Sequence, residues 1–299
     1  MSSPAVIESK RVSLGVRLAD LVELTKPRIT LMVVLTAGIG VLLSSGGRVD
    51  LSLAIHALLG TGLVAAGSAA LNHVLERDLD ALMERTANRP LPTGRMDPDA
   101  ALLFGVGLAV GGLLELTLAV NLLTALLGAI ALAGYIFVYT PLKRISSLAT
   151  VVGAIPGALP PLMGWTAVSD RLDLGGIVLF TILFLWQLPH FLAIAWMCRE
   201  DYSRAGVPVL PVVEPDGRST ARQMMLYGAA LLPVSLMPTV LGLTGTTYFL
   251  GTLALGCFFL AVCVAFALSF STGAARRVLL VSVLYLPAVL LIMVLDRVA

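Results

Sequence analysis

Acidic and amide side chains recur at one-turn spacing in the segment 72–95. Asn72, Glu76 and Asp80 are four residues apart, so on a helix they share one face. Two carboxylates one turn apart repel each other unless a cation lies between them. Hard divalent cations such as Mg²⁺ prefer such oxygen ligands and often bridge carboxylates to a diphosphate. The spacing predicts a magnesium-assisted diphosphate site, although a solvated helix end with mixed charges would share part of this pattern.

Arginines accompany these acids. Arg77, Arg85 and Arg89 lie close enough in the sequence to neutralise phosphate oxygens, and a guanidinium can do so through two hydrogen bonds. Lys143 and Arg144 add two further cations after a later apolar segment. We expect this basic set to stabilise a diphosphate as it leaves its substrate.

A second polar cluster follows a later apolar segment and includes Arg199, Glu200, Asp201 and Tyr202. If both clusters lie at the same end of their helices, they can hold one diphosphate between them with one or two metal ions. Glu200 and Asp201 are adjacent, so either carboxylate could meet the metal.

The elements that position these residues are apolar helices. The chain of 299 residues is 58% hydrophobic and only 13% charged, about half the charge of a soluble domain. A helix of about 20 apolar residues crosses a bilayer, and unbroken runs of this length exclude barrel strands. We therefore predict an all-α, polytopic membrane protein with nine helices around a central cavity. The predicted spans are 29–46, 51–72, 100–120, 122–140, 148–168, 174–197, 222–243, 246–270 and 277–295.

The basic residues also predict an orientation. Seventeen of the 20 lysines and arginines fall before the first span, in the even-numbered connections or at the first residue of the span that follows such a connection. By the positive-inside rule the N-terminus is cytoplasmic and the C-terminus outside. We expect residues 1–28 to form a polar cytoplasmic arm and residues 29–299 a single transmembrane domain. Residues 1–28 carry no secretory or organelle-targeting pattern, so we expect the plasma (inner) membrane of a prokaryote.

Composition excludes several other functions. The net charge of +2 is too small to indicate nucleic-acid binding. The three cysteines have no CxxC spacing, so they predict neither a disulfide framework nor a zinc site.

Three histidines and one glutamate lie within the predicted spans or at their ends. His190 follows a proline and is flanked by tryptophans, so it is either a cavity contact or a histidine bonded to a neighbouring helix. We interpret His73 as structural and His56 as a packed or interfacial residue without a polar neighbour. Glu115 lies near the external end of its span, where it can reach water.

Glycines also recur within these spans. Gly105, Gly107, Gly111 and Gly112 fall in one predicted span and indicate close helix packing.

The polar motifs resemble those of the intramembrane aromatic prenyltransferase superfamily, whose members carry one acidic motif after the second span and another after the sixth. The resemblance extends from about residue 26 to the C-terminus. Strings that resemble its protohaem-farnesylating branch are Arg85-Thr86-x-Asn88-Arg89-Pro90, Tyr139-Thr140-Pro141-Leu142-Lys143-Arg144, Pro189-His190-Phe191 and Asp201-Tyr202-x-x-Ala205-Gly206.

This resemblance implies transfer of a farnesyl group from farnesyl diphosphate to protohaem IX (haem b), with Mg²⁺ as the cofactor. It also implies a haem A synthase or oxidase-assembly factors as partners. The residues that we expect to be catalytic are Asn72, Glu76, Asp80 and Asp201; Glu200 joins these four as a potential metal ligand. The expected substrate-binding residues are Lys26, Arg28, Arg77, Asp78, Arg89, Tyr139, Lys143, Arg144, His190, Arg199 and Tyr202.

The sequence departs from the superfamily pattern at two places and leaves alternatives open. Glu76 stands where an aspartate is usual, and Glu200-Asp201 replaces a regularly spaced second pair. A related enzyme could instead prenylate a quinone precursor or chlorophyllide. A secondary transporter is the alternative from another class, but transporters place ionisable groups near the bilayer midplane. A haem-binding scaffold would not need two acidic clusters.

Overall fold

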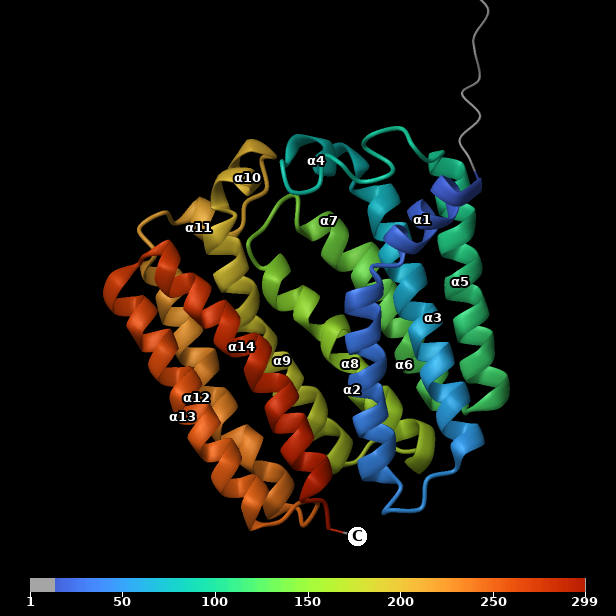
Figure 1. Ribbon diagram of the computed structural model, residues 1–299, viewed down its shortest axis with the longest axis vertical. Coiled ribbons are helices and arrows are strands. Elements are labelled where there is room, and N and C mark those ends of the chain that lie inside the picture. Colours follow the sequence, from blue (N-terminus) through green and yellow to red (C-terminus); the bar gives the residue numbers. More distant parts are fainter. Residues whose placement is uncertain (1–13, 299) are drawn as a thin grey trace, which may run out of the picture.

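The computed structural model describes residues 14–298, so Lys10 and Arg11 of the predicted arm lie outside the described residues. Within that arm, α1 (Leu14–Leu24) forms a helix that leads into the first span. Figure 1 shows α1 at the same end of the molecule as the short helices α4 (Arg77–Leu82), α10 (Arg199–Arg204) and α11 (Leu210–Val213). The C-terminal end lies at the opposite end, as an odd number of spans requires.

Nine helices of the described chain are long and apolar enough to cross a membrane, which confirms the predicted number. Each boundary lies within five residues of its predicted position. The spans are α2 (Pro27–Ser44), α3 (Leu51–Leu75), α5 (Pro98–Ala119), α6 with η1 and α7 (Leu122–Ala133, Gly134–Tyr139 and Thr140–Leu142), α8 (Ala149–Ser169), α9 (Leu174–Met197), α12 (Arg218–Val240), α13 (Thr246–Ser269) and α14 (Thr272–Leu295).

Polar side chains mark where several of these helices begin. Asp50 accepts hydrogen bonds from two backbone N–H groups at the start of α3. Asp97, Asn121 and Ser271 each accept one such hydrogen bond at the starts of α5, α6 and α14. Such caps satisfy backbone donors that have no partner within the helix.

Glycines allow α3 and α5 to approach closely. A Cβ atom at Gly112 would lie 2.7 Å from the carbonyl oxygen of Gly60, and one at Gly67 would lie 2.6 Å from the backbone nitrogen of Ala109. The prediction that all four α5 glycines mark packing was wrong at two positions. A Cβ at Gly107 or Gly111 meets nothing within 4 Å, because these residues lie on the other faces of α5.

The interpretation of His56 as a residue without a polar neighbour was also wrong. Its Nδ1 lies 2.6 Å from Oε1 of Glu115. The two helices run antiparallel, so a residue near the start of α3 lies beside one near the end of α5. The pair lies at the end of the bundle remote from the charged loops.

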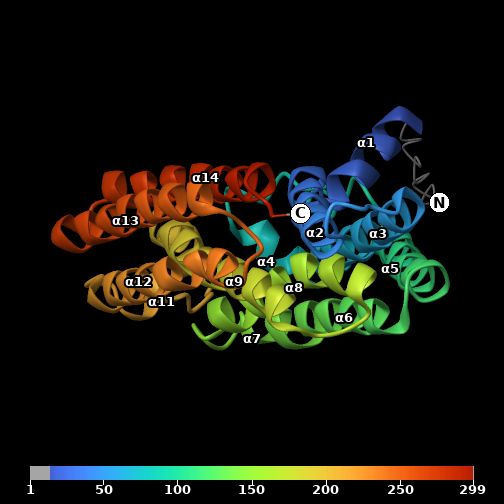
Figure 2. The ribbon, with the colours of Figure 1, turned by 90° about the horizontal axis from the view of Figure 1, so that it is seen from below.

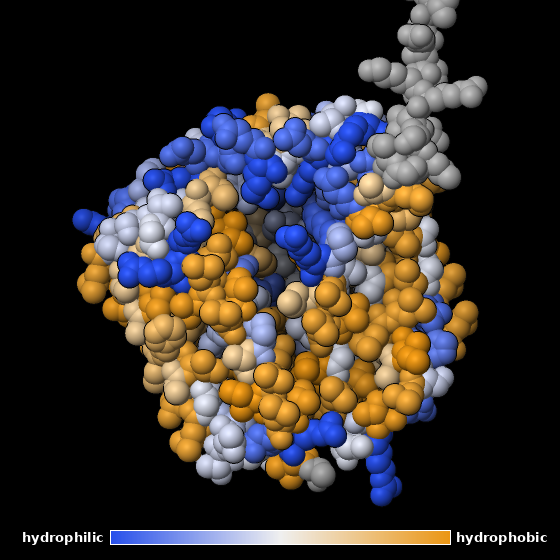
Figure 3. All heavy atoms as spheres, viewed as in Figure 1, coloured by the Kyte–Doolittle hydropathy of each residue, from blue (hydrophilic) through white to orange (hydrophobic). Residues whose placement is uncertain are grey.

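The helices enclose a recess that opens on one face. Viewed from below, α12–α14 lie on one side of the molecule and α2, α3 and α5 on the other (Figure 2). The surface in Figure 3 is mainly hydrophobic over the helices and hydrophilic at the end that carries α1 and α4, where hydrophilic side chains border the recess. The hydrophilic end of the molecule therefore lies at the mouth of the recess.

Candidate active site

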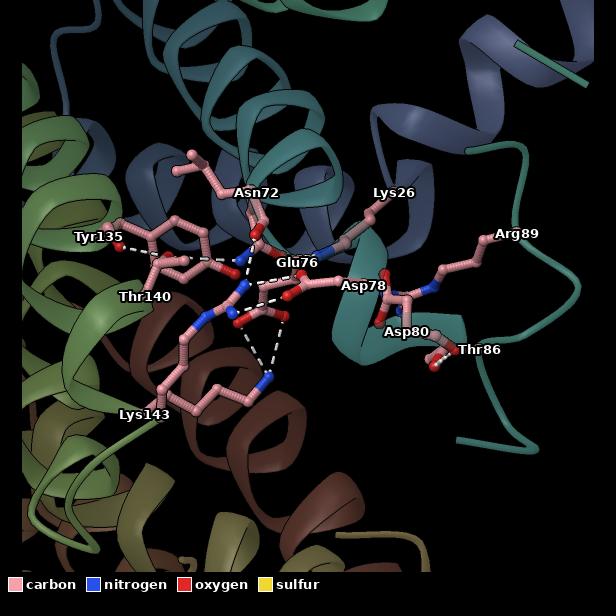
Figure 4. Close-up of polar contacts among 12 residues, drawn as sticks. Lys26, Asn72, Glu76, Asp78, Asp80, Thr86, Arg89, Tyr135, Thr140 and Lys143 are labelled. Carbon is pink, nitrogen blue, oxygen red and sulfur yellow. Dashed lines mark hydrogen bonds and ion pairs between the residues drawn. The ribbon is translucent and has the colours of Figure 1, made fainter. Parts of the chain in front are cut away.

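The helical path continues from α3 into α4, which keeps the three predicted acidic-motif residues one turn apart. The backbone nitrogen of Glu76 donates to the carbonyl of Asn72 at 2.9 Å, and that of Asp80 donates to Glu76 at 2.8 Å. All three residues are buried, with 2%, 3% and 1% of Asn72, Glu76 and Asp80 exposed. Figure 4 shows them with the cations that surround them.

Glu76 is paired with a lysine from a distant part of the sequence. Nζ of Lys143 donates to both carboxylate oxygens, at 2.9 and 3.0 Å. Burial by itself would lower the pKa of Lys143, but nearby Tyr139 and Glu76 outweigh it and raise that pKa. The lysine is therefore a fixed positive charge at the mouth of the cavity.

Asp80 is paired with Arg89 from the loop that follows α4. One guanidinium nitrogen of Arg89 lies 2.7 Å from Oδ2 of Asp80. The hydroxyl of Thr86 donates to the backbone carbonyl of Asp80 at 2.9 Å, so the loop is folded back onto the acidic motif. The Arg-Thr-x-Asn-Arg-Pro string that begins at Arg85 thus lies beside the carboxylate that it follows in sequence.

Lys26 reaches Asn72 from the junction of α1 and α2. Its Nζ donates to Oδ1 of Asn72 at 2.8 Å, and the amide of Asn72 donates to the hydroxyl of Thr140 at 3.4 Å. Lys26 has a φ angle of 47°, a left-handed conformation that residues other than glycine seldom adopt. Burial, together with the nearby charge of Arg89, lowers the pKa of Lys26 to about 8.

Asp78 and Arg144 form a bidentate ion pair at the surface, outside the buried carboxylates of Glu76 and Asp80. The guanidinium donates to both oxygens of Asp78, at 2.7 and 2.8 Å, and to the carbonyl of Leu75 at 2.7 Å. These hydrogen bonds lower the pKa of the exposed Asp78 carboxyl. Because Arg144 also bonds a carbonyl in the last turn of α3, it supports the helix end that carries the acidic motif.

The second acidic motif approaches the first through apolar contacts. Leu79 and Met83 pack against Ala205 and Val207, and Tyr202 lies against this cluster. One ion pair joins the same segments, because Arg204, which also contacts Asp201 within α10, lies 3.3 Å from Glu84. The prediction that the loops after α3 and α9 meet is consistent with this arrangement.

Three other predicted residues, Arg77, Arg199 and Glu200, do not contact Asn72, Glu76 or Asp80 in the described part of the chain. Arg77 and Glu200 are exposed, and neither side chain bonds to another residue in the described part of the chain. Arg199 lies over the ring of Trp196, 4.9 Å from its centre, and donates to the backbone carbonyl of that residue at 2.9 Å. Of the adjacent acids, Asp201 is the more buried.

Two further predicted residues, His190 and Tyr139, have polar or aromatic partners within the helical bundle. Nδ1 of His190 lies 2.8 Å from the hydroxyl of Ser282 on α14, and the ring stacks on Trp186. Tyr139 stacks on Tyr135 within η1, a π-helical turn of the kind that is frequent at functional sites. No sequence signal marks Ser282, because isolated serines are common in membrane helices.

The donor set suits a magnesium ion with a diphosphate. Glu76, Asp80 and Asn72 supply buried, hard oxygen atoms, the type that Mg²⁺ prefers. In the described chain no three His, Cys, Asp or Glu side chains are close enough to hold a metal by themselves. Mg²⁺ commonly completes its octahedral shell with water and substrate phosphate, so few protein ligands are needed. Lys26, Lys143 and Arg89 each contact one of these three residues, so they would lie beside a diphosphate held there.

Among the described residues, nine apolar spans carry buried carboxylates and cations at one end, which are the features that an intramembrane prenyltransferase needs. Residues 33–294 match the UbiA prenyltransferase family, and the chain belongs to that family. The chain is 52% identical to a protoheme IX farnesyltransferase of Solibacter usitatus, with 93% of this chain and 98% of the relative covered. It is 43% identical to the protein of that name from Myxococcus xanthus, with 98% and 99% covered.

Solved structures share the fold at low sequence identity. A digeranylgeranylglyceryl phosphate synthase superposes with a TM-score of 0.80 at 18% identity, covering 94% of this chain and 98% of the other. A UbiA homologue from Archaeoglobus fulgidus, bound to GPP and Mg²⁺, gives a TM-score of 0.62 at 16% identity, covering 92% and 99%. The fold of this multi-pass membrane protein is therefore that of the family.

Proposed function

We propose that this protein transfers the farnesyl group of farnesyl diphosphate to a vinyl group of protohaem IX, giving haem O. The observation that carries the proposal is the buried acidic motif with three paired cations at the mouth of an apolar cavity. This arrangement suits a substrate with a diphosphate head and an isoprenoid tail. The choice of protohaem as the acceptor rests on the relatives that are named protoheme IX farnesyltransferase.

The reaction breaks the bond between C1 of the farnesyl group and the diphosphate oxygen. As this bond lengthens, negative charge gathers on the leaving group, and Lys26, Lys143 and Arg89 stabilise it. Fixed cations that oppose developing charge lower the barrier more than they strengthen substrate binding. Asn72, Glu76 and Asp80 would hold Mg²⁺, with Asp201 from the second motif. The bound ion supplies further positive charge to the leaving group.

The electron pair of the vinyl group then forms the new carbon–carbon bond to C1 of the farnesyl group. The cation left on the former vinyl carbon adds water and releases a proton, giving the hydroxyethylfarnesyl substituent. The apolar walls of the recess exclude bulk water from the allylic cation until this bond has formed. We assign His190, which is fixed by Ser282 and Trp186, to a contact with the porphyrin.

The distribution of basic residues sets the expected orientation of the protein in the membrane. We place the acidic motifs at the cytoplasmic surface, with the N-terminus inside and the C-terminus outside, because the basic residues gather at that end. Residues 29–299 act as one transmembrane domain in this account. Haem O would pass to a haem A synthase or to oxidase-assembly factors.

A substrate panel tests the proposed reaction. Membranes that contain the protein are incubated with farnesyl diphosphate, Mg²⁺ and one of three acceptors: protohaem, a quinone precursor or chlorophyllide. Liquid chromatography with mass spectrometry should detect farnesylated, hydrated haem and no other prenylated product. Prenylation of the quinone precursor or of chlorophyllide, with unchanged protohaem, would assign the protein to another branch of the family.

A further inference from the structure

A cavity of about 400 Å³ opens beside the acidic motif, between the start of α2, the end of α3 and the loop after α4. Its wall includes Lys26, Arg28, His73 and Arg89. Neither Glu76 nor Asp80 lines it, although Arg89 pairs with Asp80. The cavity is therefore a second anion-attracting space that shares two cations with the diphosphate site.

His73 provides an independent indication of a ligand. His73 is only 2% exposed, yet neither nitrogen of its ring has a hydrogen-bond partner in the described part of the chain. Buried polar groups are nearly always bonded, so an unbonded imidazole in a cavity wall indicates a missing partner. An imidazole can donate a hydrogen bond to an anionic oxygen in either of its neutral forms.

The charge of the cavity favours an anion. Among the described residues, Glu23 is the only acidic one in its wall, and this carboxylate lies 3.3 Å from the guanidinium of Arg95, which partly neutralises it. Arg28 is exposed at the rim, and its charge is free of any ion pair in the described chain. Lys26 and Arg89 add positive charge where the cavity meets the acidic motif.

We propose that this cavity binds the propionate carboxylates of the porphyrin substrate, with Arg28 and His73 as their principal contacts. This inference rests on the proposed function, which makes protohaem the acceptor. Protohaem carries its two carboxylates on one edge of the macrocycle and its vinyl groups toward the opposite edge. Anchoring the polar edge at the mouth leaves the apolar, vinyl-bearing edge to enter the recess.

The chemistry of the lining separates this role from diphosphate binding. A diphosphate that is bound through Mg²⁺ needs the carboxylates of Glu76 and Asp80, which lie outside the cavity. A propionate needs only cationic and hydrogen-bond donors, which Arg28 and His73 supply. Because Lys26 and Arg89 border both sites, the two substrates place their charged groups on either side of the same cations.

Binding of protohaem in the absence of farnesyl diphosphate tests this site directly. Purified protein in phosphatidylcholine nanodiscs, which carry no net lipid charge, is titrated with protohaem while the Soret band is monitored. Arg28→Gln and His73→Gln should each weaken binding by about tenfold, as loss of one charge-assisted hydrogen bond predicts. The matched control Arg276→Gln removes an exposed arginine from the same end of the molecule and should leave the affinity unchanged.

Protohaem dimethyl ester makes the assignment specific to the carboxylates. The wild type should bind the ester more weakly than protohaem, and Arg28→Gln should cause little additional loss with the ester. Equal weakening of acid and ester by Arg28→Gln would overturn the proposal. If Arg28→Gln leaves the affinity for protohaem unchanged but Mg²⁺-pyrophosphate displaces protohaem less well from this variant than from the wild type, the cavity would be assigned to the diphosphate instead.

These readouts separate the inference from the proposed reaction. The titration contains no farnesyl donor, so it reports carboxylate binding even if no farnesylated product forms. Arg28 is exposed, so its variant should fold and keep the test decisive even if the buried His73 variant does not. If the wild type shows the same affinity for protohaem and its ester, the cavity does not bind propionates.

Discussion

Each polar side chain at the centre of the site is matched to one cation. Glu76 faces Lys143, Asp80 faces Arg89, and the amide oxygen of Asn72 accepts from Lys26. Burial of an unpaired carboxylate is strongly unfavourable, so these cations stabilise the substrate-free fold. The same cations can turn to phosphate oxygens when substrate and metal neutralise the acids.

Substitution of Lys143 should therefore affect both stability and catalysis. Lys143→Met leaves the buried Glu76 carboxylate without its partner, and we expect a loss of about 3–5 kcal/mol in unfolding free energy. Turnover should fall as well, because one of the charges that stabilises the leaving diphosphate is gone. Thermal unfolding in detergent and product formation measure the two effects separately.

The double variant Glu76→Gln/Lys143→Met separates these two roles. Removing both charges should recover much of the lost stability, because no unpaired buried charge remains. It should not recover turnover, since both a proposed metal ligand and a leaving-group cation are absent. Full activity in the double variant would show that neither residue takes part in the reaction.

Sequence reasoning predicted much of this site but not its pairings. The i, i+4 spacing was sufficient to place Asn72, Glu76 and Asp80 on one face, because helical geometry is local. The pairing of Glu76 with Lys143 joins residues 67 positions apart, and only the packing of the spans sets such a contact. The contact between His56 and Glu115 was missed, although their similar depths on antiparallel helices gave a usable signal.

At the scale of elements, backbone contact between α3 and α5 fixes the helix that carries the acidic motif. Gly60 and Gly112 bring the two backbones together, whereas Gly111 on the same helix faces open space. Close approach through small residues replaces the hydrophobic driving force that is absent between helices in lipid. The position of Asn72 and Glu76 thus depends on glycines elsewhere along α3 and α5.

Alanine substitutions at adjacent glycines should have opposite outcomes. Gly112→Ala places a methyl group against the backbone of α3, and we expect a loss of about 1–3 kcal/mol from overpacking. Gly111→Ala meets no neighbour and should be neutral or slightly stabilising, since alanine favours the helix by about 0.5–1 kcal/mol. Thermal unfolding of the two variants in one detergent is the measurement; equal destabilisation would contradict the packing described.

The elements were largely predictable, and their irregularities were not. Long apolar runs predicted all nine spans, because the thickness of the bilayer fixes their length. The π-helical turn Gly134–Tyr139 has no local signature, since it depends on how that span packs on its neighbours. The same reason explains why sequence alone did not separate the packed glycines of α5 from the exposed ones.

At the scale of the molecule, an apolar body carries one strongly charged end. The short helices and polar loops that contain both motifs lie at this end (Figure 1), whereas the opposite end holds only three of the 20 lysines and arginines of the sequence, namely Arg48, Arg171 and Arg297. This asymmetry predicts the orientation of the protein in the membrane.

In a cysteine-free variant, a cysteine at Gly47 should react with an impermeant maleimide from outside the cell. A cysteine at Arg276 should react only after the membrane is opened; the reverse pattern would invert the topology.

The central claim is that the buried acidic motif drives transfer of a farnesyl group to protohaem. The most direct measurement is mass-spectrometric detection of farnesylated haem from protohaem, farnesyl diphosphate and Mg²⁺, comparing wild type with Asp80→Asn. Asparagine retains the size of the side chain and an acceptor for Arg89 but removes the charge that metal binding needs. We expect a Mg²⁺-dependent product from the wild type and none from folded Asp80→Asn. Wild-type levels of product from that variant would contradict the account.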